Sequence, residues 1–305
     1  MKPAPFEYFA PTSVDEALAH LVEFGYDAKV LAGGQSLIPM MNFRLAQPRV
    51  IVDINNIPEL SFIRANGDGG LHIGAMARHN RVESASLVAD RAPLIFEAMP
   101  HIATVQVRSR GTFGGSLAHA DPSAELPAVC VALDGSFLLR SQRGERWIPA
   151  NEFFVGLFTS VLEPDELLIE VKFPPLPART GCALVEVARR SHDFALVGVT
   201  AVVSLDRNNT CQGARLVFFS VGEGPVEARQ AGVMLENKEL SAELIRAASE
   251  TAAVQDIDPG SDIHASAAYR RHLAGVLARR ALEQASDRAR GDGPSSDGST
   301  PARQQ

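Results

Sequence analysis

The segment AKVLAGGQS, residues 28–36, places a short apolar strand directly before a glycine pair, Gly33 and Gly34. A second pair, Gly114 and Gly115, stands in the segment TFGGS, residues 112–116. Paired glycines let the backbone approach a ligand closely and turn its N–H groups inward. Hydroxyl donors flank both pairs: Ser36, Thr112 and Ser116. The pattern predicts two glycine loops that hold a phosphate-bearing ligand from two sides.

A glycine pair can also be a simple turn, and the residues alone leave that alternative open. Neither segment fits the G-x-G-x-x-G fingerprint or the P-loop pattern, so an ordinary dinucleotide-binding fold or an ATPase is not indicated. If the first pair does hold phosphate, a side chain at Gly34 should fill the phosphate space. The residues therefore indicate the kind of ligand without naming it.

Composition narrows the class of protein. A chain of 305 residues is long enough for two or three packed units. The formal net charge of -7 argues against nucleic-acid binding, which usually needs a basic face. The longest apolar stretch, near residues 196–205, is far shorter than a membrane span. We expect a cytoplasmic protein without a membrane span.

The three cysteines are too few and too widely spaced for a metal cluster. Cys130, Cys182 and Cys211 form no C-x-x-C pair, whereas iron–sulfur and structural zinc sites normally need about four ligands. We interpret them as free buried thiols and expect no metal on this chain.

The order of predicted elements divides the chain into domains. Ser13 and Glu16 form a capping box before a helix that ends at Gly25. The run Pro174-Pro175-Leu176-Pro177 is a clear break. Before this break we expect strands at 28–32, 50–54, 71–76, 136–141, 145–148 and 166–173, and helices at 79–85, 92–102 and 124–133. After it we expect strands at 183–188, 197–205 and 214–221, and helices at 226–235, 242–254 and 267–285.

These elements predict an α+β protein with two domains and a tail. A two-lobed α/β domain covers residues 1–176, with lobes at 1–56 and 57–176. A C-terminal domain covers residues 177–286. Residues 287–305 are rich in Gly, Ser, Pro, Asp and Arg, which predicts a disordered tail.

A polar cluster after the second glycine pair has two interpretations. His119, Asp121 and Glu125 could form an acid–base or metal site. Asp121 and Ser123 could instead cap the helix that follows, which we favour for Asp121. Glu125 could accept hydrogen bonds from ligand hydroxyl groups. No catalytic residue is predicted.

With these residues in view, the chain resembles the FAD-binding medium subunit of molybdenum hydroxylases, the family of aerobic carbon monoxide dehydrogenase and xanthine dehydrogenase. Four ordered motifs carry the resemblance, which runs to about residue 285. They are LAGGQSLIPMM at 31–41, RGTFGGSLAHADPSAE at 110–125, the stretch from Arg189 to Ala195, and YRRHL at 269–273.

The resemblance implies a PCMH-type FAD-binding domain, followed by a C-terminal domain with a three-stranded antiparallel sheet and helices. It implies that both glycine segments line FAD, that Glu125 meets FAD hydroxyl groups, and that Leu168 and Ile169 approach the flavin ring or its linker. The implied FAD-binding residues are Val30, Leu31, Ala32, Gly33, Gly34, Gln35, Ser36, Leu37, Thr112, Gly114, Gly115, Ser116, Ala118, Glu125, Leu168 and Ile169.

The resemblance also implies partners and a role. The family assembly contains a small subunit with two [2Fe-2S] clusters and a large subunit with a molybdopterin cofactor, arranged as a dimer of heterotrimers. Substrate is oxidised on the large subunit, and electrons pass through the clusters and FAD to an external acceptor. The implied function is an electron-transfer subunit of an oxidoreductase. The alternatives are a self-sufficient FAD-dependent oxidase and a non-catalytic binding protein.

Some positions depart from the family pattern. Many carbon monoxide dehydrogenases have His in place of Gln35 and Tyr in place of Phe194, which favours an N-heterocycle or an aldehyde as substrate over carbon monoxide. Ser116 replaces a common Asn. Val185 stands near a position that is often Lys in the xanthine dehydrogenase branch, which leaves an ionic contact there in doubt.

Overall fold

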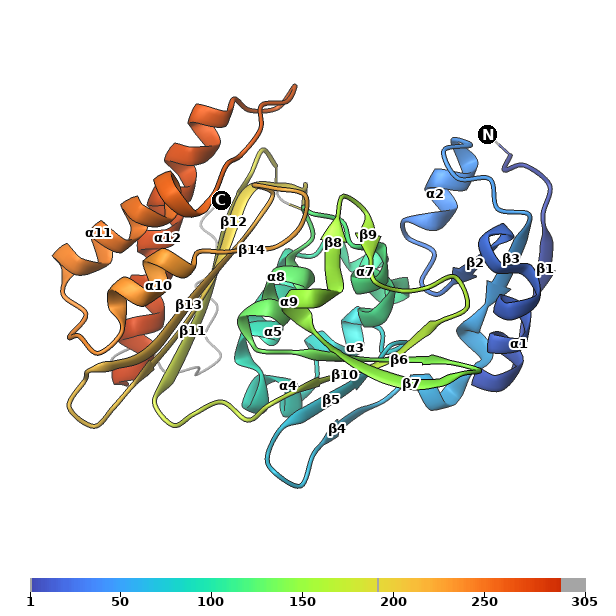
Figure 1. The fold of residues 1–305 in the computed structure, drawn as a ribbon, viewed down its shortest axis with the longest axis horizontal. Coiled ribbons are helices and arrows are strands. Elements are labelled where there is room, and N and C mark those ends of the chain that lie inside the picture. Colours follow the sequence, from blue (N-terminus) through green and yellow to red (C-terminus); the bar gives the residue numbers. More distant parts are fainter. Residues whose placement is uncertain (1, 191, 292–305) are drawn as a thin grey trace, which may run out of the picture.

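The N-terminal lobe is a parallel three-stranded sheet covered by one helix (Figure 1). The structure is a computed structural model that describes residues 2–190 and 192–291. The strand order is β1-β3-β2. The elements of this lobe are β1 (Glu7–Phe9), α1 (Val14–Phe24), η1 (Gly25–Asp27), β2 (Ala28–Leu31), α2 (Leu37–Asn42), β3 (Val50–Asp53) and η2 (Ile54–Asn56).

Local sequence signals explain helix α1. The Ser13 hydroxyl accepts a hydrogen bond from the Glu16 backbone N–H at 3.2 Å, as the capping box predicts. Gly25 ends the helix with φ +48°, a conformation that favours glycine. The buried side chains of Leu18 and Leu21 form part of the lobe's core with Val50 and Val52 of β3.

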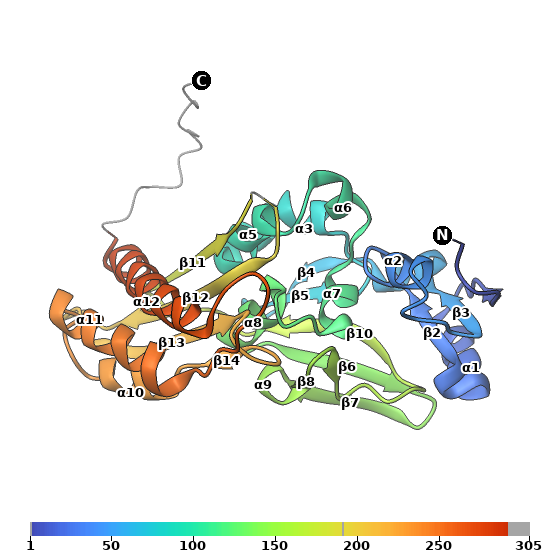
Figure 2. The same cartoon turned by 90° about the horizontal axis from the view of Figure 1, so that it is seen from above.

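The second lobe is an antiparallel five-stranded sheet in the order β4-β5-β10-β6-β7, with helices packed on it (Figure 2). Its strands are β4 (Ile63–Ala65), β5 (Leu71–Gly74), β6 (Ser136–Ser141), β7 (Gly144–Pro149) and β10 (Leu167–Phe173), and a hairpin adds β8 (Phe154–Gly156) and β9 (Thr159–Ser160). Its helices are η3 (Pro58–Leu60), α3 (His79–Glu83), α4 (Ser86–Arg91), α5 (Pro93–Ala98), η4 (Met99–His101), α6 (Val105–Arg110), α7 (Phe113–His119), α8 (Glu125–Ala132) and α9 (Ala150–Phe153).

The C-terminal domain contains the three long antiparallel strands that were predicted, with helices on one face. They are β11 (Thr180–Ala188), β12 (Ala195–Leu205) and β13 (Cys211–Phe219), and a two-residue strand β14 (Val226–Glu227) joins the edge. The helices are α10 (Arg229–Leu235), α11 (Ala242–Thr251), the π-helical turn η5 (Ala252–Asp256) and α12 (Ala267–Arg290). The α+β fold class is therefore confirmed.

Two predicted elements of this domain differ from the structure. The helix predicted from residue 226 begins at Arg229, because Val226 and Glu227 pair with β13 instead. The last helix continues to Arg290, because Ala285 and Ala289 are buried in the domain core. The predicted tail therefore overlaps this helix at residues 287–290, and residues 292–305 lie outside the described residues.

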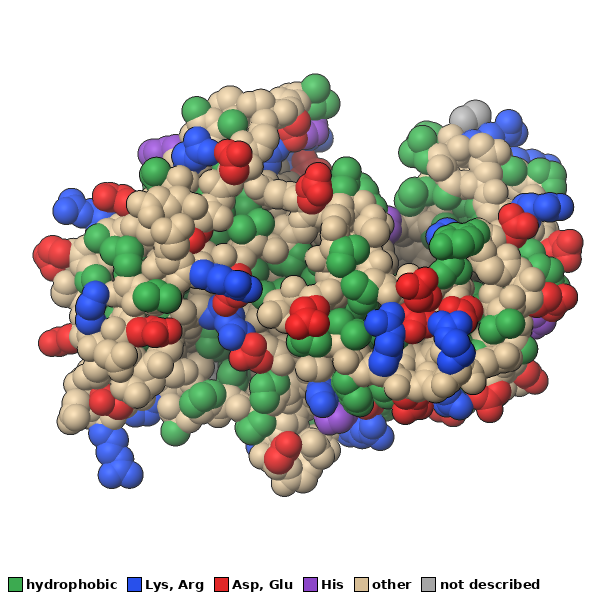
Figure 3. Space-filling model, in the orientation of Figure 1, with side chains coloured by type: hydrophobic (Ala, Val, Ile, Leu, Met, Phe, Trp, Pro, Cys, Tyr) green, Lys and Arg blue, Asp and Glu red, His purple; other side chains and the backbone are tan. Residues whose placement is uncertain are grey.

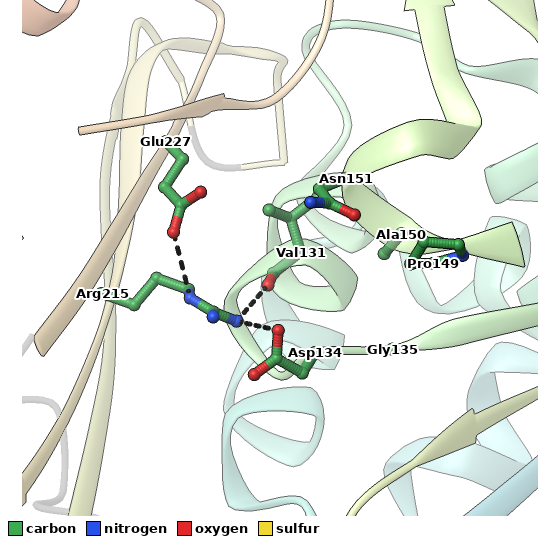
Figure 4. A pocket seen from close by; sticks show the side chains of 8 residues that line it. All are labelled: Val131, Asp134, Gly135, Pro149, Ala150, Asn151, Arg215 and Glu227. Atoms are coloured by element: carbon green, nitrogen blue, oxygen red, sulfur yellow. Dashed lines mark hydrogen bonds and ion pairs between the residues drawn. The ribbon is translucent and has the colours of Figure 1, made fainter. Parts of the chain in front are cut away.

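The two domains share a core across the proline-rich boundary. Cys182, Leu184 and Phe219 of the C-terminal sheet belong to the same buried cluster as the helices of the second lobe. Arg215 of β13 adds a polar contact: its side chain bonds the Val131 carbonyl and pairs with Asp134 (Figure 4). The cavity beside it measures about 50 Å³ and contains none of the predicted cofactor residues. We interpret Arg215 as a structural contact between the domains.

Replacing Gly181 with valine should destabilise the C-terminal domain. A side chain there would lie 2.6 Å from the Ala289 backbone nitrogen and would also meet the Ala285 carbonyl, so helix α12 would have to move off β11. Overpacking of this kind costs about 1–3 kcal/mol, and a backbone obstacle places the effect at the upper end. Thermal unfolding measures the change. Gly213→Val in β13 is the control, because no atom lies within 4 Å of its added carbon; an equal loss in both variants would contradict the argument.

Across the described ranges, 2–190 and 192–291, no helix combines the length and the apolar character needed to cross a membrane.

Candidate cofactor site

The first glycine pair forms an open turn between β2 and α2. Gly34 adopts φ +72°, which turns the chain sharply and favours glycine. The five consecutive backbone N–H groups from Gly33 to Leu37 have no hydrogen-bond partner in the described part of the chain. This turn is partly exposed, so its N–H groups can reach a ligand. A run of free N–H groups around a left-handed residue suits an anion such as a phosphate.

The structure gives a different reason why Gly34 should be glycine from the one that the sequence suggested. A carbon added to Gly34 would lie 3.1 Å from side-chain atoms of both Leu31 and Ile38. It would therefore press on apolar neighbours and strain the backbone, which is a different obstacle from the filled phosphate space that the sequence suggested. The prediction that Gly34 must be glycine stays, with a different physical reason.

The second glycine pair lies in the first turn of helix α7, so the prediction of a loop at residues 112–116 is wrong. Thr112 is the N-cap, and its hydroxyl accepts from the Gly115 N–H at 3.2 Å. The Phe113 and Gly114 N–H groups donate to the carbonyls of Ala77 and Ala75, at 2.9 and 2.8 Å. These donors are thus already occupied by the protein. Gly114 is glycine for packing, because an added carbon would lie 2.5 Å from the Ala75 side chain.

The tertiary structure brings the two glycine segments into direct contact. A carbon added to Gly33 would lie 2.6 Å from the Arg110 carbonyl oxygen and 3.1 Å from the Thr112 nitrogen. A carbon added to Gly115 would lie 3.4 Å from the Ala32 side chain. The surface is hollowed between the N-terminal lobe and the rest of the molecule (Figure 3). The free N–H groups of the turn and the exposed side of α7 thus belong to one site.

The other predicted residues of these segments surround this contact. Ser116 and Ala118 lie on the accessible side of α7, whereas Thr112 is buried. The exposed Gln35 side chain folds back and donates to the Gly33 carbonyl at 3.0 Å. Val30 and Ala32 pack at the edge of the N-terminal core, and Leu31 and Leu37 bracket the turn as the last residue of β2 and the first of α2.

Glu125 is buried in the first turn of α8, with 8% of its surface exposed. Burial raises its pKa to about 7; its own backbone N–H lowers it, and the charge of Glu186 raises it further. Glu186 of β11 bonds the His101 ring at 3.0 Å, and this bond raises the pKa of His101. Glu125 therefore gains or loses its proton close to neutral pH, and a ligand hydroxyl that donates a hydrogen bond to it would favour the ionised form.

Leu168 and Ile169 fall on a β-bulge of strand β10, where the register with β6 shifts. The Ile169 carbonyl accepts from the Ala75 N–H at 2.8 Å, which places Ile169 beside the segment that holds Gly114. The Ile169 side chain packs against the N-terminal core, which includes Ala32 as a neighbour. Leu168 is buried in the core of the second lobe. Of the two, Ile169 lies nearer the glycine contact.

Sequence reasoning missed two polar residues that hold this contact. The Asn55 amide donates to the Ala32 carbonyl at 2.8 Å. Arg78 donates to the Asn55 side-chain oxygen at 2.6 Å and to the Arg110 carbonyl. One signal in the sequence could have indicated Asn55: this polar residue follows a buried apolar strand, β3. Polar residues are expected at the end of a strand that faces a site.

The acid–base interpretation of His119, Asp121 and Glu125 gains no support. The favoured interpretation of Asp121 and Ser123 as helix caps is also wrong, because the N-cap residue of α8 is Ala124 and no side chain of the described residues caps this helix. Asp121 instead accepts from the Ser123 N–H at 2.9 Å in the turn before α8. Burial lowers the pKa of His119, whose ring lies against Phe158. Among residues 2–190 and 192–291, no three His, Cys, Asp or Glu side chains could together hold a metal ion.

Comparison with known proteins identifies the family. The sequence model described as "FAD binding domain in molybdopterin dehydrogenase" matches residues 4–176, and "CO dehydrogenase flavoprotein C-terminal domain" matches residues 183–285. The chain belongs to this family of FAD-binding medium subunits, the oxidoreductase family that includes carbon monoxide and xanthine dehydrogenases.

Individual relatives match over nearly their whole length. The chain is 42% identical over 290 residues to 6-hydroxypseudooxynicotine dehydrogenase complex subunit alpha of Paenarthrobacter nicotinovorans, covering 95% of this chain and 97% of that one. A carbon monoxide dehydrogenase structure from Hydrogenophaga pseudoflava matches with TM-score 0.90 and 40% identity, covering 93% and 98%. Quinoline 2-oxidoreductase from Pseudomonas putida 86 matches with TM-score 0.89 and 36% identity, covering 95% and 99%.

Proposed function

We propose that this chain is the FAD-carrying electron-transfer subunit of a heterotrimeric molybdenum hydroxylase. Partner subunits would carry the [2Fe-2S] clusters and the molybdopterin cofactor. The bound flavin would accept electrons from the clusters and pass them to an external acceptor, chemistry that belongs to the cofactor. The three cysteines of this chain are buried and free, which supports placing the clusters on another chain and agrees with a cytoplasmic protein.

The observation that carries the proposal is the run of free N–H groups from Gly33 to Leu37. These groups would hold the diphosphate of FAD. Because the first N–H groups of α7 already donate to other parts of the protein, the direct contribution of α7 would come from the Ser116 hydroxyl. The buried Thr112 would contribute indirectly, as the N-cap that fixes the first turn of α7. Gly114 and Gly115 would let the helix approach, with Ala118 beside them.

The remaining predicted contacts have different chemistry. Glu125 would accept hydrogen bonds from FAD hydroxyl groups, and Ile169, with Leu168 behind it, would present the apolar surface of the bulge. The apolar residues Val30, Leu31, Ala32 and Leu37 would shape the turn around Gly33, Gly34, Gln35 and Ser36. The donors and apolar contacts of this site fit a dinucleotide with a diphosphate at its centre.

For the substrate we propose a nitrogen heterocycle, purine-like compounds included, or an aldehyde. One similar protein is named for quinoline, a nitrogen heterocycle. The relative named for carbon monoxide is about equally similar, so the order of preference rests on Gln35 and Phe194, where many carbon monoxide dehydrogenases have His and Tyr. We further propose a dimer of heterotrimers as the assembly.

A visible spectrum of the purified full-length chain tests the cofactor. We expect uptake of FAD with flavin absorption bands and quenching of flavin fluorescence. A folded, colourless protein that takes up no FAD would refute the proposal. Turnover of a heterocycle or aldehyde by this chain alone would instead support a self-sufficient oxidase. Isolation of the complex from the source cell with molybdenum and iron analysis tests the partners.

A further inference from the structure

A hydrogen-bonded bridge crosses the contact between the two glycine segments. Asn55 holds the first segment through the Ala32 carbonyl, and its amide also bonds the Asp53 carboxylate at 2.5 Å. Arg78 bonds Asn55 with one nitrogen and the Arg110 carbonyl with another. We call this set, Asp53, Asn55 and Arg78, the Asn55–Arg78 bridge.

The bridge joins parts of the chain that lie far apart in the sequence. Asn55 follows β3 of the N-terminal lobe, whereas Arg78 stands just before α3 in the second lobe. Arg78 also pairs with Thr112 in an isolated β-bridge, and the His79 N–H donates to the Gly111 carbonyl at 3.0 Å. The Arg78 guanidinium group therefore links the Arg110 carbonyl to Asn55, which holds Ala32 next to the first turn. The backbone of residues 78 and 79 separately holds residues 111 and 112, which lead into α7.

The electrostatics around Arg78 also favour a bound anion. Burial and then the positive charge of Arg110 lower the pKa of Arg78, while the charge of Asp53 raises it. Arg110 belongs to the segment against which Gly33 packs. Two arginine charges that repel one another are stabilised by a nearby anion. The diphosphate of FAD carries that charge.

We propose that Arg78 and Asn55 are positioning residues that set the separation of the two glycine segments and thereby the affinity for FAD. This inference rests on the proposed function. Arg78 acts through Asn55 and the Arg110 carbonyl. Arginine suits this position because its rigid fork offers several donors, so it can bond both acceptors at once, whereas the lysine ammonium is a single point charge.

FAD binding to Arg78→Met in the full-length apoprotein tests the inference. The variant loses the hydrogen bonds that the charged Arg78 makes to Asn55 and to the Arg110 carbonyl. We therefore expect the FAD dissociation constant to rise about 10- to 100-fold. Arg81→Met, three residues later within α3, is the matched control, because exposed Arg81 bonds a single carbonyl, Ser61, at 3.2 Å. Arg78→Lys should give an intermediate constant, since it can keep only part of the bridge. A merely structural arginine would lower the melting temperature without this graded loss of affinity.

Asn55→Ala provides a second route if Arg78→Met does not fold. It removes the link to Ala32 and leaves Arg78 bonded to the Arg110 carbonyl. Both single variants should weaken FAD binding. The fold-loss of FAD affinity in the double variant should be smaller than the product of the two single fold-losses, because the residues act as one unit. FAD affinity equal to wild type in folded Arg78→Met or Asn55→Ala, or an equal loss in Arg81→Met, would overturn the inference. A wild-type chain that binds no FAD would instead refute the proposed function.

Discussion

Gly33→Val is expected to give a folded protein that no longer retains FAD. The new side chain would begin 2.6 Å from the Arg110 carbonyl and 2.8 Å from the Gly111 α-carbon. Both obstacles are backbone atoms that cannot rotate away, so the two glycine segments must separate. An overpacking cost of roughly 3 kcal/mol, applied to a contact that shapes the site, corresponds to at least about a 100-fold loss of affinity.

Flavin content after purification and titration of the apoprotein with FAD measure this loss. Gly67→Val is the control, because Gly67 is exposed in the turn between β4 and β5 and no atom lies within 4 Å of its added carbon. Circular dichroism of both variants establishes that each is folded. Normal FAD content in folded Gly33→Val would show that the contact between the segments does not form the cofactor site.

Glu125→Gln is expected to stabilise the apoprotein at pH 8 while it weakens FAD binding. The folded-state pKa of about 7 lies above the ordinary value of 4.5. The group's contribution to stability is therefore complete below pH 4.5 and is lost as the pH rises through about 7. Above pH 7 the buried carboxylate costs up to about 3 kcal/mol, which the neutral amide avoids.

The affinity for FAD should depend on pH in the opposite direction to the stability of the apoprotein. A carboxylate that accepts hydrogen bonds from hydroxyl groups is favoured in its ionised form, so wild-type affinity should rise with pH up to about 7. Glu125→Gln should bind FAD about 10-fold more weakly at pH 8, with little dependence on pH, since one charge-assisted hydrogen bond is lost. Denaturant unfolding and FAD titration between pH 5 and 8 measure the two effects separately.

Glu152→Gln is the matched control for this experiment. Glu152 also lies in the first turn of a helix, α9, but its side chain is exposed. It should change neither the stability nor the FAD affinity. If Glu125→Gln destabilised the apoprotein at pH 8, the argument that burial penalises the carboxylate would be wrong. If the variant bound FAD as tightly as wild type, the proposed contact between Glu125 and the FAD hydroxyl groups would be wrong.

The first glycine segment could be predicted because its structure is mostly local. A strand and a glycine turn follow one another within residues 28–36, and neighbouring residues decide both, whereas the short helix α2 (Leu37–Asn42) was not predicted. The capping box of α1 is equally local. Four motifs in order also allowed the family to be predicted, which the comparisons confirm.

The second glycine segment could not be predicted in the same way. Its N–H groups bond the carbonyls of Ala75 and Ala77, which lie just after β5 and more than 30 residues earlier in the chain. Nothing within residues 112–116 distinguishes an open loop from a helix whose donors are already occupied. Strand β14 is a similar case, because its pairing with β13 overrides the helical pattern of residues 226–235.

The sequence by itself determined where glycine is required, which strand leads into the turn, and to which family the chain belongs. Only the tertiary structure decided which backbone N–H groups remain free, that Gly33 packs against residues 110–112, and that Asn55 and Arg78 hold this contact. It also decided that Glu125 is buried. The physical reason is that a donor's freedom and a carboxyl group's burial depend on neighbours brought in from distant parts of the chain.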